Sequence, residues 1–245
     1  MNQILILGGT GLARKLATAL SEEQAISFVT SLAGRTQKPL PIDGPVISGG
    51  FGGVEGLSKF LIEQNITHIV DATHPYAQQI STSAVQAAQQ TGLPVCRLVT
   101  PAWQPGIGDI WHSYASEKQA AAALPVGAKV LLTTGHKGLA EIVWRRDVVL
   151  HIRLIEPPSI SLPDHCTVIL DRPPYSLTQE KRLFESRQIT HLMTKNAGGD
   201  ATRSKLLAAA ELGTTVLMIE RAPEPDVLTF RHPAEVISWI KPALS

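Results

Sequence analysis

The sequence has little net charge, few cysteines and no long apolar run, and each shortage excludes a class of protein. The 245 residues carry a formal net charge of +1, so we do not expect a global field that attracts nucleic acid. Cys96 and Cys166 lie in separate apolar runs and fit neither a metal pattern nor a disulfide framework. The first apolar run, Ile4–Leu7, is too short for a signal peptide, and no run reaches the ~18 residues of a membrane span. We therefore expect a cytoplasmic protein that binds neither nucleic acid nor membrane.

What the sequence does contain is an alternation of short apolar runs and Ala/Leu-rich stretches. Ile4–Leu7 is followed by a glycine turn and the helical stretch Leu12–Leu20, and Ile69-Val70 is followed by a turn and the stretch Gln78–Gln90. Apolar strands of this kind between helices predict parallel sheets that are covered on both faces. The fold class is therefore α/β.

The chain also repeats itself in order and at a nearly constant offset. Three pairs of words look alike: Leu5–Gly8 and Leu132–Gly135, Ile66–Val70 and Ile189–Met193, Thr91–Val95 and Leu212–Val216. The pattern predicts two similar α/β halves. The alternative is that short apolar words recur by chance in any two α/β sheets.

We place the boundary between the halves after Pro101. The segment Thr100–Gly108 carries two prolines and two glycines, which suits a linker. Ser116 and Gln119 form a capping-box pattern at the start of the next helix. The expected domains are residues 1–101 and residues 102–245.

A glycine turn lies between the first expected strand and the first expected helix. Gly8, Gly9, Thr10 and Gly11 stand where a phosphate needs close backbone approach and free N–H groups. The match to the dinucleotide fingerprint is partial, because Arg14 occupies the place of the third glycine. A tight turn without a ligand is the alternative.

The second expected strand, about Ser27–Ser31, ends without the acidic residue that holds the ribose 2′-hydroxyl in NAD sites. Ser31 offers a hydroxyl and Arg35 a cation, which suits a 2′-phosphate. The pattern favours NADP over NAD, and a solvated loop cation is the alternative for Arg35.

The loop Asp71–Ala77 follows an apolar strand and is rich in hydrogen-bonding side chains. Ligands of open α/β sheets bind at the carboxyl ends of strands. His74 can change its charge near neutral pH and Tyr76 can donate a proton, so both are candidate catalytic residues. Thr73 is a candidate for cofactor binding. Helix capping by Asp71 and Thr73, with His74 merely packed, is the alternative.

The segment Gly49–Gly53 has four glycines around one aromatic residue. Such a loop can approach a ligand closely or move as a lid. Gly50, Phe51 and Gly52 are therefore candidates for substrate binding, with a plain flexible turn as the alternative.

Two loops of the second half also follow expected strands. Thr133–Lys137 is one and Thr194–Thr202 is the other, with Arg203 and Lys205 in the helix after it. A lysine at a helix start can bind an anion. The candidates are Lys195 and Asn196 for the cofactor, and Lys137 and Arg203 for the substrate. Surface cations are the alternative.

Two other patterns carry less weight. Tyr114 and Lys118 copy the Tyr/Lys spacing of short-chain dehydrogenases, but we expect them at a helix start with no strand before it. The eight histidines show no spacing typical of ligands, so we expect no metal.

Taken in order, these loops resemble the precorrin-6A and cobalt-precorrin-6A reductase family. The matching words are Ile4–Thr10, Gly49–Gly53, Asp71–Ala77, Arg97–Val99 with Pro101 and Trp103, Leu131–Gly135, Arg153–Pro158, Thr194–Gly199 and Glu220–Pro223. One departure is Leu12, where family members often carry an acidic residue.

The resemblance implies two Rossmann-like domains with mainly parallel sheets that face each other across a cleft. It implies NADPH as hydride donor and a tetrapyrrole substrate, precorrin-6A or its cobalt form. The reaction would reduce one carbon–carbon double bond of the macrocycle in cobalamin biosynthesis, and neighbouring enzymes of the pathway would be the expected protein contacts. The presence of cobalt, the oligomeric state and the proton donor stay open.

Two other function classes stay open. One is another NADP-dependent dehydrogenase or epimerase, which would need the Tyr/Lys pair on a helix after a strand. The other is a non-catalytic NADP-sensing module, which has no reason to keep polar loops after the strands of the second half.

Overall fold

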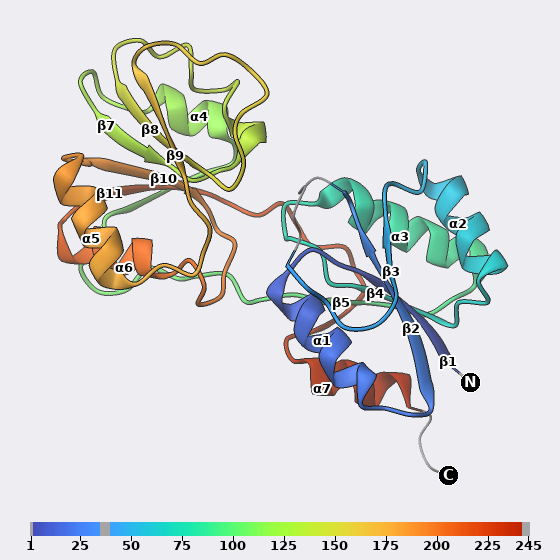
Figure 1. Ribbon diagram of the computed structural model, residues 1–245. Coiled ribbons are helices and arrows are strands. Elements are labelled where there is room, and N and C mark those ends of the chain that lie inside the picture. The colour runs from blue at the N-terminus through green and yellow to red at the C-terminus, as the bar shows by residue number, and fades with distance from the viewer. Residues whose placement is uncertain (1, 35–39, 242–245) are drawn as a thin grey trace. The chain divides into compact units, whose positions relative to one another are not determined.

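The computed structural model describes residues 2–34 and 40–241, which fold into two α/β units (Figure 1). Residues 1–101 and 223–245 form the first unit, and residues 102–222 form the second. The predicted class, α/β with two Rossmann-like parallel sheets, is confirmed. Arg35 lies outside the described residues. Within them, no helix is both long and apolar enough to cross a membrane.

The first unit is a sheet with helices on both faces. Its six strands are, in spatial order, β12 (Leu228–Phe230), β5 (Val95–Leu98), β4 (His68–Asp71), β1 (Asn2–Leu7), β2 (Ile26–Leu32) and β3 (Val46–Ser48). Neighbouring strands pair in parallel. One face carries α1 (Gly11–Ser21) and α7 (Pro233–Ile240), and the other carries α2 (Val54–Glu63) and α3 (Gln78–Thr91).

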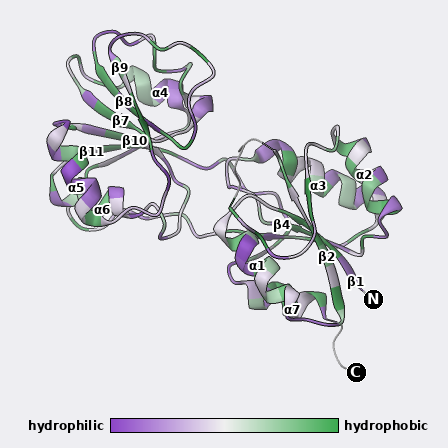
Figure 2. Cartoon of the chain, viewed as in Figure 1, coloured by the Kyte–Doolittle hydropathy of each residue, from purple (hydrophilic) through white to green (hydrophobic). Residues whose placement is uncertain are grey.

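Strand β1 shows why the apolar runs are continuous. Ile4 and Ile6 pack toward α1 and α7, whereas Leu5 and Leu7 pack toward α2 and α3. Successive side chains of a strand point to opposite faces, so a sheet covered on both faces needs apolar residues at every position. Figure 2 shows the resulting hydrophobic strands between helices with mixed faces.

The second unit repeats this architecture. Its six parallel strands are, in spatial order, β6 (Trp111–Tyr114), β11 (Thr215–Ile219), β10 (His191–Lys195), β7 (Lys129–Leu132), β8 (Val149–Leu154) and β9 (Cys166–Leu170). α5 (Leu177–Ser186) and α6 (Ser204–Glu211) cover one face, and α4 (Glu117–Ala122) lies on the other. A short 3₁₀ turn, η1 (His136–Gly138), follows β7.

The two sheets correspond strand for strand. In spatial order, β12, β5, β4, β1, β2 and β3 match β6, β11, β10, β7, β8 and β9. The three repeated words of the sequence fall at matching strands: β1 with β7, β4 with β10, and β5 with β11. The repeat in the sequence therefore reflects two sheets with the same strand order.

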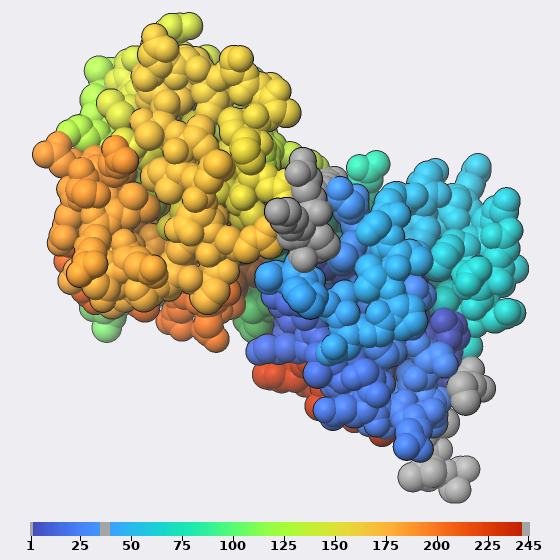
Figure 3. All heavy atoms as spheres, in the orientation of Figure 1, coloured from blue at the N-terminus to red at the C-terminus, as the bar shows by residue number. Residues whose placement is uncertain are grey.

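The expected second domain, residues 102–245, is corrected by the return of the chain. Residues after Ala222 belong to the first unit, where β12 pairs with β5 and α7 packs against α1. Figure 3 shows these red atoms against the blue atoms of the N-terminal segment. The apolar face of α7 would suit either sheet by its pattern, so the sequence did not reveal which sheet it completes.

A second correction concerns β6. We expected no strand before Lys118, but Tyr114 is the last residue of β6. The strand escaped notice because its four residues, Trp111–Tyr114, are polar or half-exposed at a sheet edge and lack an apolar run.

A substitution at Val236 on α7 tests whether this helix belongs to the first unit. This side chain is fully buried in the core formed with β1 and α1, so Val236→Ala should lower the free energy of unfolding by about 2 kcal/mol. Hydrogen exchange should accelerate in β5 and leave β11 unchanged. Leu228→Ala on β12, where the side chain is 51% exposed, is the control with little effect. Accelerated exchange in β11 would contradict the assignment of α7 to the first unit.

Candidate active site

Many of the predicted site residues lie in the loops that follow β1, β4, β7 and β10. In the first sheet the strand order reverses between β1 and β4, and in the second between β7 and β10. Open α/β sheets bind ligands outside the carboxyl ends of strands at such switch points. The loops after these four strands are therefore the natural candidates in each unit.

The glycine turn after β1 is built for close backbone approach. The Gly8 N–H donates to the Ser31 carbonyl at 2.8 Å, and Gly9 has a φ of +114°. The Thr10 hydroxyl accepts from the Ala13 N–H at 3.1 Å and donates to the Ala72 carbonyl at 2.7 Å. Thr10 thereby caps α1 and joins its N-terminus to the loop after β4.

Arg14 adds charge to this turn. Its Nη2 lies 3.7 Å from the position that a Cβ on Gly11 would occupy. The residue that breaks the dinucleotide fingerprint thus brings a cation to the start of α1, where the helix dipole also favours an anion.

Buried ion pairs hold the loop after β4. Asp71 Oδ1 accepts from the Thr73 N–H at 3.1 Å and from the Thr73 hydroxyl at 2.6 Å. Asp71 Oδ2 lies 3.5 Å from Arg97 Nε, and Arg97 also pairs with Glu224. Thr73, a predicted cofactor ligand, is buried and its hydroxyl is engaged with Asp71. The network therefore fixes the shape of the loop, and the Thr73 side chain is not exposed for direct contact with a ligand.

His74 and Tyr76 project from that loop. His74 is exposed and Tyr76 is half-buried. The Tyr76 N–H donates to His74 Nδ1 at 3.3 Å, and the two ring centres are 5.6 Å apart. The structure therefore brings both candidate catalytic residues together, with His74 Nδ1 in the role of acceptor.

The glycine-rich segment before α2 divides into a packed and an open part. Phe51 contacts Phe60 edge-on, at 5.1 Å between ring centres, and packs against the core of the α2–α3 face. Gly50 and Gly52 are exposed, and Gly52 has a φ of +80°. Their backbone is open to a ligand, whereas Phe51 anchors the segment.

Lys195 at the end of β10 is engaged with groups of its own unit. Its Nζ lies 2.9 Å from Glu117 Oε1 and donates to the Thr134 carbonyl at 3.0 Å. Burial acts to raise the pKa of Glu117, but the hydrogen bond and charge of Lys195 prevail and lower it. The lysine that we predicted as an anion ligand is thus already paired with a carboxylate of α4.

Asn196 connects the loop after β10 to both ends of the second unit. Its Oδ1 accepts from the Trp103 N–H at 2.7 Å and its Nδ2 donates to the Trp103 carbonyl at 3.0 Å. The indole N–H of Trp103 donates to the Gly199 carbonyl at 2.9 Å. Arg221 Nε donates to the Asn196 carbonyl at 2.7 Å. Asn196 is buried, and its amide supports the loop.

The remaining candidates differ in exposure. Lys137 in η1 and Arg203 before α6 are exposed. Ser31 on β2 is buried, and its carbonyl accepts from Gly8. Among the described residues, no group of three or more His, Cys, Asp or Glu side chains is arranged to hold a metal ion.

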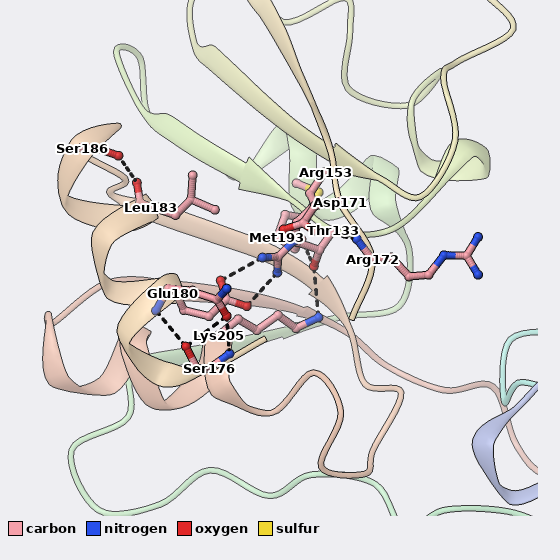
Figure 4. Close-up of polar contacts among 11 residues, drawn as sticks. Thr133, Arg153, Asp171, Arg172, Ser176, Glu180, Leu183, Ser186, Met193 and Lys205 are labelled. Atoms are coloured by element: carbon pink, nitrogen blue, oxygen red, sulfur yellow. Dashed lines mark hydrogen bonds and ion pairs between the residues drawn. The ribbon is translucent and has the colours of Figure 1, made fainter. Parts of the chain in front are cut away.

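A buried polar cluster in the second unit was not predicted. Arg153 on β8 makes two hydrogen bonds to Glu180 on α5, at 2.9 and 3.0 Å, and its guanidinium lies 4.0 Å from the centre of the Tyr175 ring. Lys205 of α6 reaches to the Thr133 hydroxyl at 3.2 Å (Figure 4). We call Thr133, Arg153, Glu180 and Lys205 the α6 cluster.

Lys205 is the unusual member of the α6 cluster. It is 5% exposed, and no carboxylate pairs with it in the described part of the chain. Burial, reinforced by Arg153 and opposed by Glu180, lowers the pKa of Lys205 to about 7. A sequence signal existed, since Ala208 and Ala209 share its helical face, and that apolar face indicates burial.

Comparisons with known proteins agree over nearly the whole chain. The family described as "CbiJ: Precorrin-6x reductase CbiJ/CobK" matches residues 3–241. The precorrin-6A reductase of Rhodococcus erythropolis is 42% identical and covers 98% of each chain. That of Mycobacterium tuberculosis is 43% identical over 90% of this chain and 89% of its own. The cobalt-precorrin-6A reductase of Priestia megaterium is 26% identical over 89% of this chain and 90% of its own.

A solved structure agrees as well. The protein described as "CobK precorrin-6A reductase" has a TM-score of 0.92 and 36% identity, and the match covers 98% of this chain and 96% of that chain.

Lys205 should reduce stability in a pH-dependent way. Because its pKa is lowered in the folded state, the unfolded state binds more protons above about pH 7, and the free energy of unfolding should rise with pH there. Lys205→Met should remove this rise and stabilise the protein at pH 7 by about 1–4 kcal/mol.

Urea unfolding at pH 6.5, 8 and 9 measures this difference. Lys181→Met, at a more exposed lysine paired with Glu211, is the control and should change the pH dependence far less. Parallel pH profiles of wild type and Lys205→Met would refute a lowered pKa.

Proposed function

The chain belongs to the family of precorrin-6x reductases, and on this premise we propose that it reduces precorrin-6A with NADPH as the hydride donor in cobalamin biosynthesis. The observation that carries the proposal is the match of residues 3–241 to the family. The solved reductase structure matches 98% of this chain, which includes both of its sheets. Because both units are included, the similarity is not that of a nucleotide-binding half alone.

The identities favour the metal-free substrate. Relatives named precorrin-6A reductase are 39–43% identical to this chain, as in Rhodobacter capsulatus at 39% and Mycobacterium tuberculosis at 43%. Relatives named cobalt-precorrin-6A reductase are 22–27% identical, as in the Methanothermobacter and Synechocystis proteins. We therefore propose precorrin-6A rather than its cobalt form.

The residues of the first unit fit a nicotinamide dinucleotide. When bound, NADPH supplies the hydride. A Cβ on Gly9 would meet no atom within 4 Å, so the backbone there is open to a phosphate, and Thr10 and Gly11 begin the helix whose N-terminus attracts it. We assign the pyrophosphate to Gly8–Gly11 with Arg14, and the 2′-phosphate to Ser31 and Arg35. Thr73 supports this site through Asp71.

The other candidates act on the substrate. We assign Gly50, Phe51 and Gly52 to contact with the macrocycle, and Lys137, Lys195 and Arg203 to its carboxylates or the pyrophosphate. Asn196 supports the loop that carries Lys195. Two roles are open to His74 and Tyr76 beside the reacting ring: delivery of the proton that the reduction consumes, or positioning of the ring.

The alternatives lose support for separate reasons. A dehydrogenase or epimerase would need the Tyr/Lys pair on a helix after a strand, but Tyr114 is the last residue of the edge strand β6, which β11 separates from β10. A non-catalytic sensor does not account for the polar loops after the strands of the second unit.

The overall proposal is tested by anaerobic incubation with NADPH and either precorrin-6A or its cobalt form. We expect loss of the NADPH absorbance together with a change in the macrocycle spectrum, faster with the metal-free substrate. No spectral change with either substrate would refute it.

Cofactor choice is tested at Arg35. Arg35→Ala should weaken NADPH binding by roughly 1.5–3 kcal/mol, because a charge-assisted hydrogen bond to the 2′-phosphate is lost. NADH binding should hardly change, since NADH lacks that phosphate. Fluorescence titration of both cofactors gives the comparison, and an equal loss for both would remove Arg35 from the 2′-phosphate site.

The loop after β4 is tested with Tyr76→Phe and His74→Ala in single-turnover reduction. If one residue delivers the proton, its loss should lower kcat by about 10²–10⁴ with NADPH affinity nearly intact. If the pair positions the ring, KM for the tetrapyrrole should rise instead. Wild-type rates and substrate binding in both variants would exclude the loop from the active site.

A further inference from the structure

Burial of Lys205 lowers the stability of the folded protein. It lies in the first turn of α6 with its ammonium group under the carboxyl end of β7, and its only hydrogen bond among the described residues goes to Thr133. Glu180, the acid whose charge acts on Lys205, already uses both oxygens to bind Arg153. A buried cation without a carboxylate destabilises a protein, so its presence at a strand end calls for a function.

Thr133 links the buried amine of Lys205 to the carboxyl end of β7, a central strand of the sheet. Thr133 is the residue directly after β7, at the switch point of the second sheet, and it is half-buried where Lys205 is almost fully buried. Its backbone N–H donates to the Met193 carbonyl at 2.9 Å, which fixes its position beside β10. Its hydroxyl accepts from Lys205 and makes only a long contact of 3.4 Å to that same carbonyl (Figure 4). The hydroxyl proton can therefore turn outward.

The surroundings of Lys205 suit a group that exchanges protons near neutral pH. The charged groups that act on it are Arg153 from β8 and Glu180 from α5, and the Trp103 ring centre lies 5.6 Å from its Nζ. With a pKa near 7 the amine and the ammonium coexist, which is the condition for an effective general acid. Lys195, by contrast, is paired with Glu117.

We propose that Lys205 and Thr133 form a relay that delivers the proton consumed in the reduction. The Thr133 O–H bond breaks as its proton bonds to the ring carbon beside the one that accepts the hydride. The π electrons of the reduced double bond form that C–H bond. At the same time an N–H bond of Lys205 breaks, its electron pair stays on nitrogen, and its proton restores the Thr133 hydroxyl. The neutral amine regains a proton from solvent.

The inference rests on the proposed function and chooses between the two roles of the loop after β4. Thr133 touches the substrate, Lys205 acts through Thr133, and His74 with Tyr76 is left to position the ring. The hydrogen bond from the Tyr76 N–H to His74 Nδ1 agrees, since this nitrogen accepts a hydrogen bond in the structure and so does not point a proton at a ligand.

Two substitutions at Lys205 separate proton transfer from charge. Lys205→Met removes the group, and Lys205→Arg keeps a positive charge that does not titrate. Both should lower the single-turnover rate constant by about 10²–10³, with the dissociation constant of NADPH within about threefold of wild type. The wild-type rate should fall about tenfold per pH unit above about pH 7, and both variants should lose this dependence.

Thr133 supplies the matched pair. Thr133→Val removes the hydroxyl with little change in shape and should lose rate as Lys205→Met does, whereas Thr133→Ser keeps the hydroxyl and should recover most of it. Lys181→Met on α5 is the control for removal of a lysine and should behave as wild type.

Three results would overturn the relay. Wild-type rates in Lys205→Arg would show that only the charge matters, and wild-type rates in Thr133→Val would exclude the hydroxyl. An unchanged pH profile in a folded Lys205→Met would exclude the lysine as proton source. No reduction by the wild-type protein would instead refute the proposed function, so the two failures are distinguishable.

Discussion

The buried guanidinium of Arg97 joins parts of the first unit that are remote in sequence. It contacts Asp71 at the end of β4 and Glu224 in the segment that returns from the second unit. Charges at such depth are tolerated because they are paired. Asp71 in turn holds Thr73, which directly precedes His74 and lies three residues before Tyr76. The loop after β4 therefore depends on a residue that the chain supplies only after the second unit.

In the second unit, side-chain hydrogen bonds to backbone groups meet the same need. The loop after β10, the counterpart of the loop after β4, is held by the amide of Asn196 on Trp103 and by Arg221 on backbone carbonyls. Trp103 and Arg221 stand next to the two points where the chain passes between units. In both units, then, the loop at the switch point is secured by residues at the crossings. These contacts let a glycine-rich loop keep its shape while its backbone stays accessible to a ligand.

The parts of the structure that follow from local pattern were predictable. Apolar runs gave β1 and β4, and the Ala-rich stretches gave α1 and α3 with ends within one or two residues. What escaped depends on tertiary contact. Nothing local shows that α7 completes the first sheet. An asparagine in a polar loop looks the same whether it binds a cofactor or, as Asn196 does, a backbone. Lys205 resembles a surface cation in the sequence, and only the apolar residues on the same face of its helix predict that it is buried.

The return of β12 and α7 to the first unit has a consequence for folding during synthesis. During synthesis the second unit has all of its strands as soon as β11 has left the ribosome, whereas the first unit, although made first, lacks β12 and α7 until the end. The nascent first sheet keeps β5 as an open edge while the strands of the second unit are being made. Vectorial folding from the N-terminus is therefore reversed here: the unit translated second is the one that can finish first.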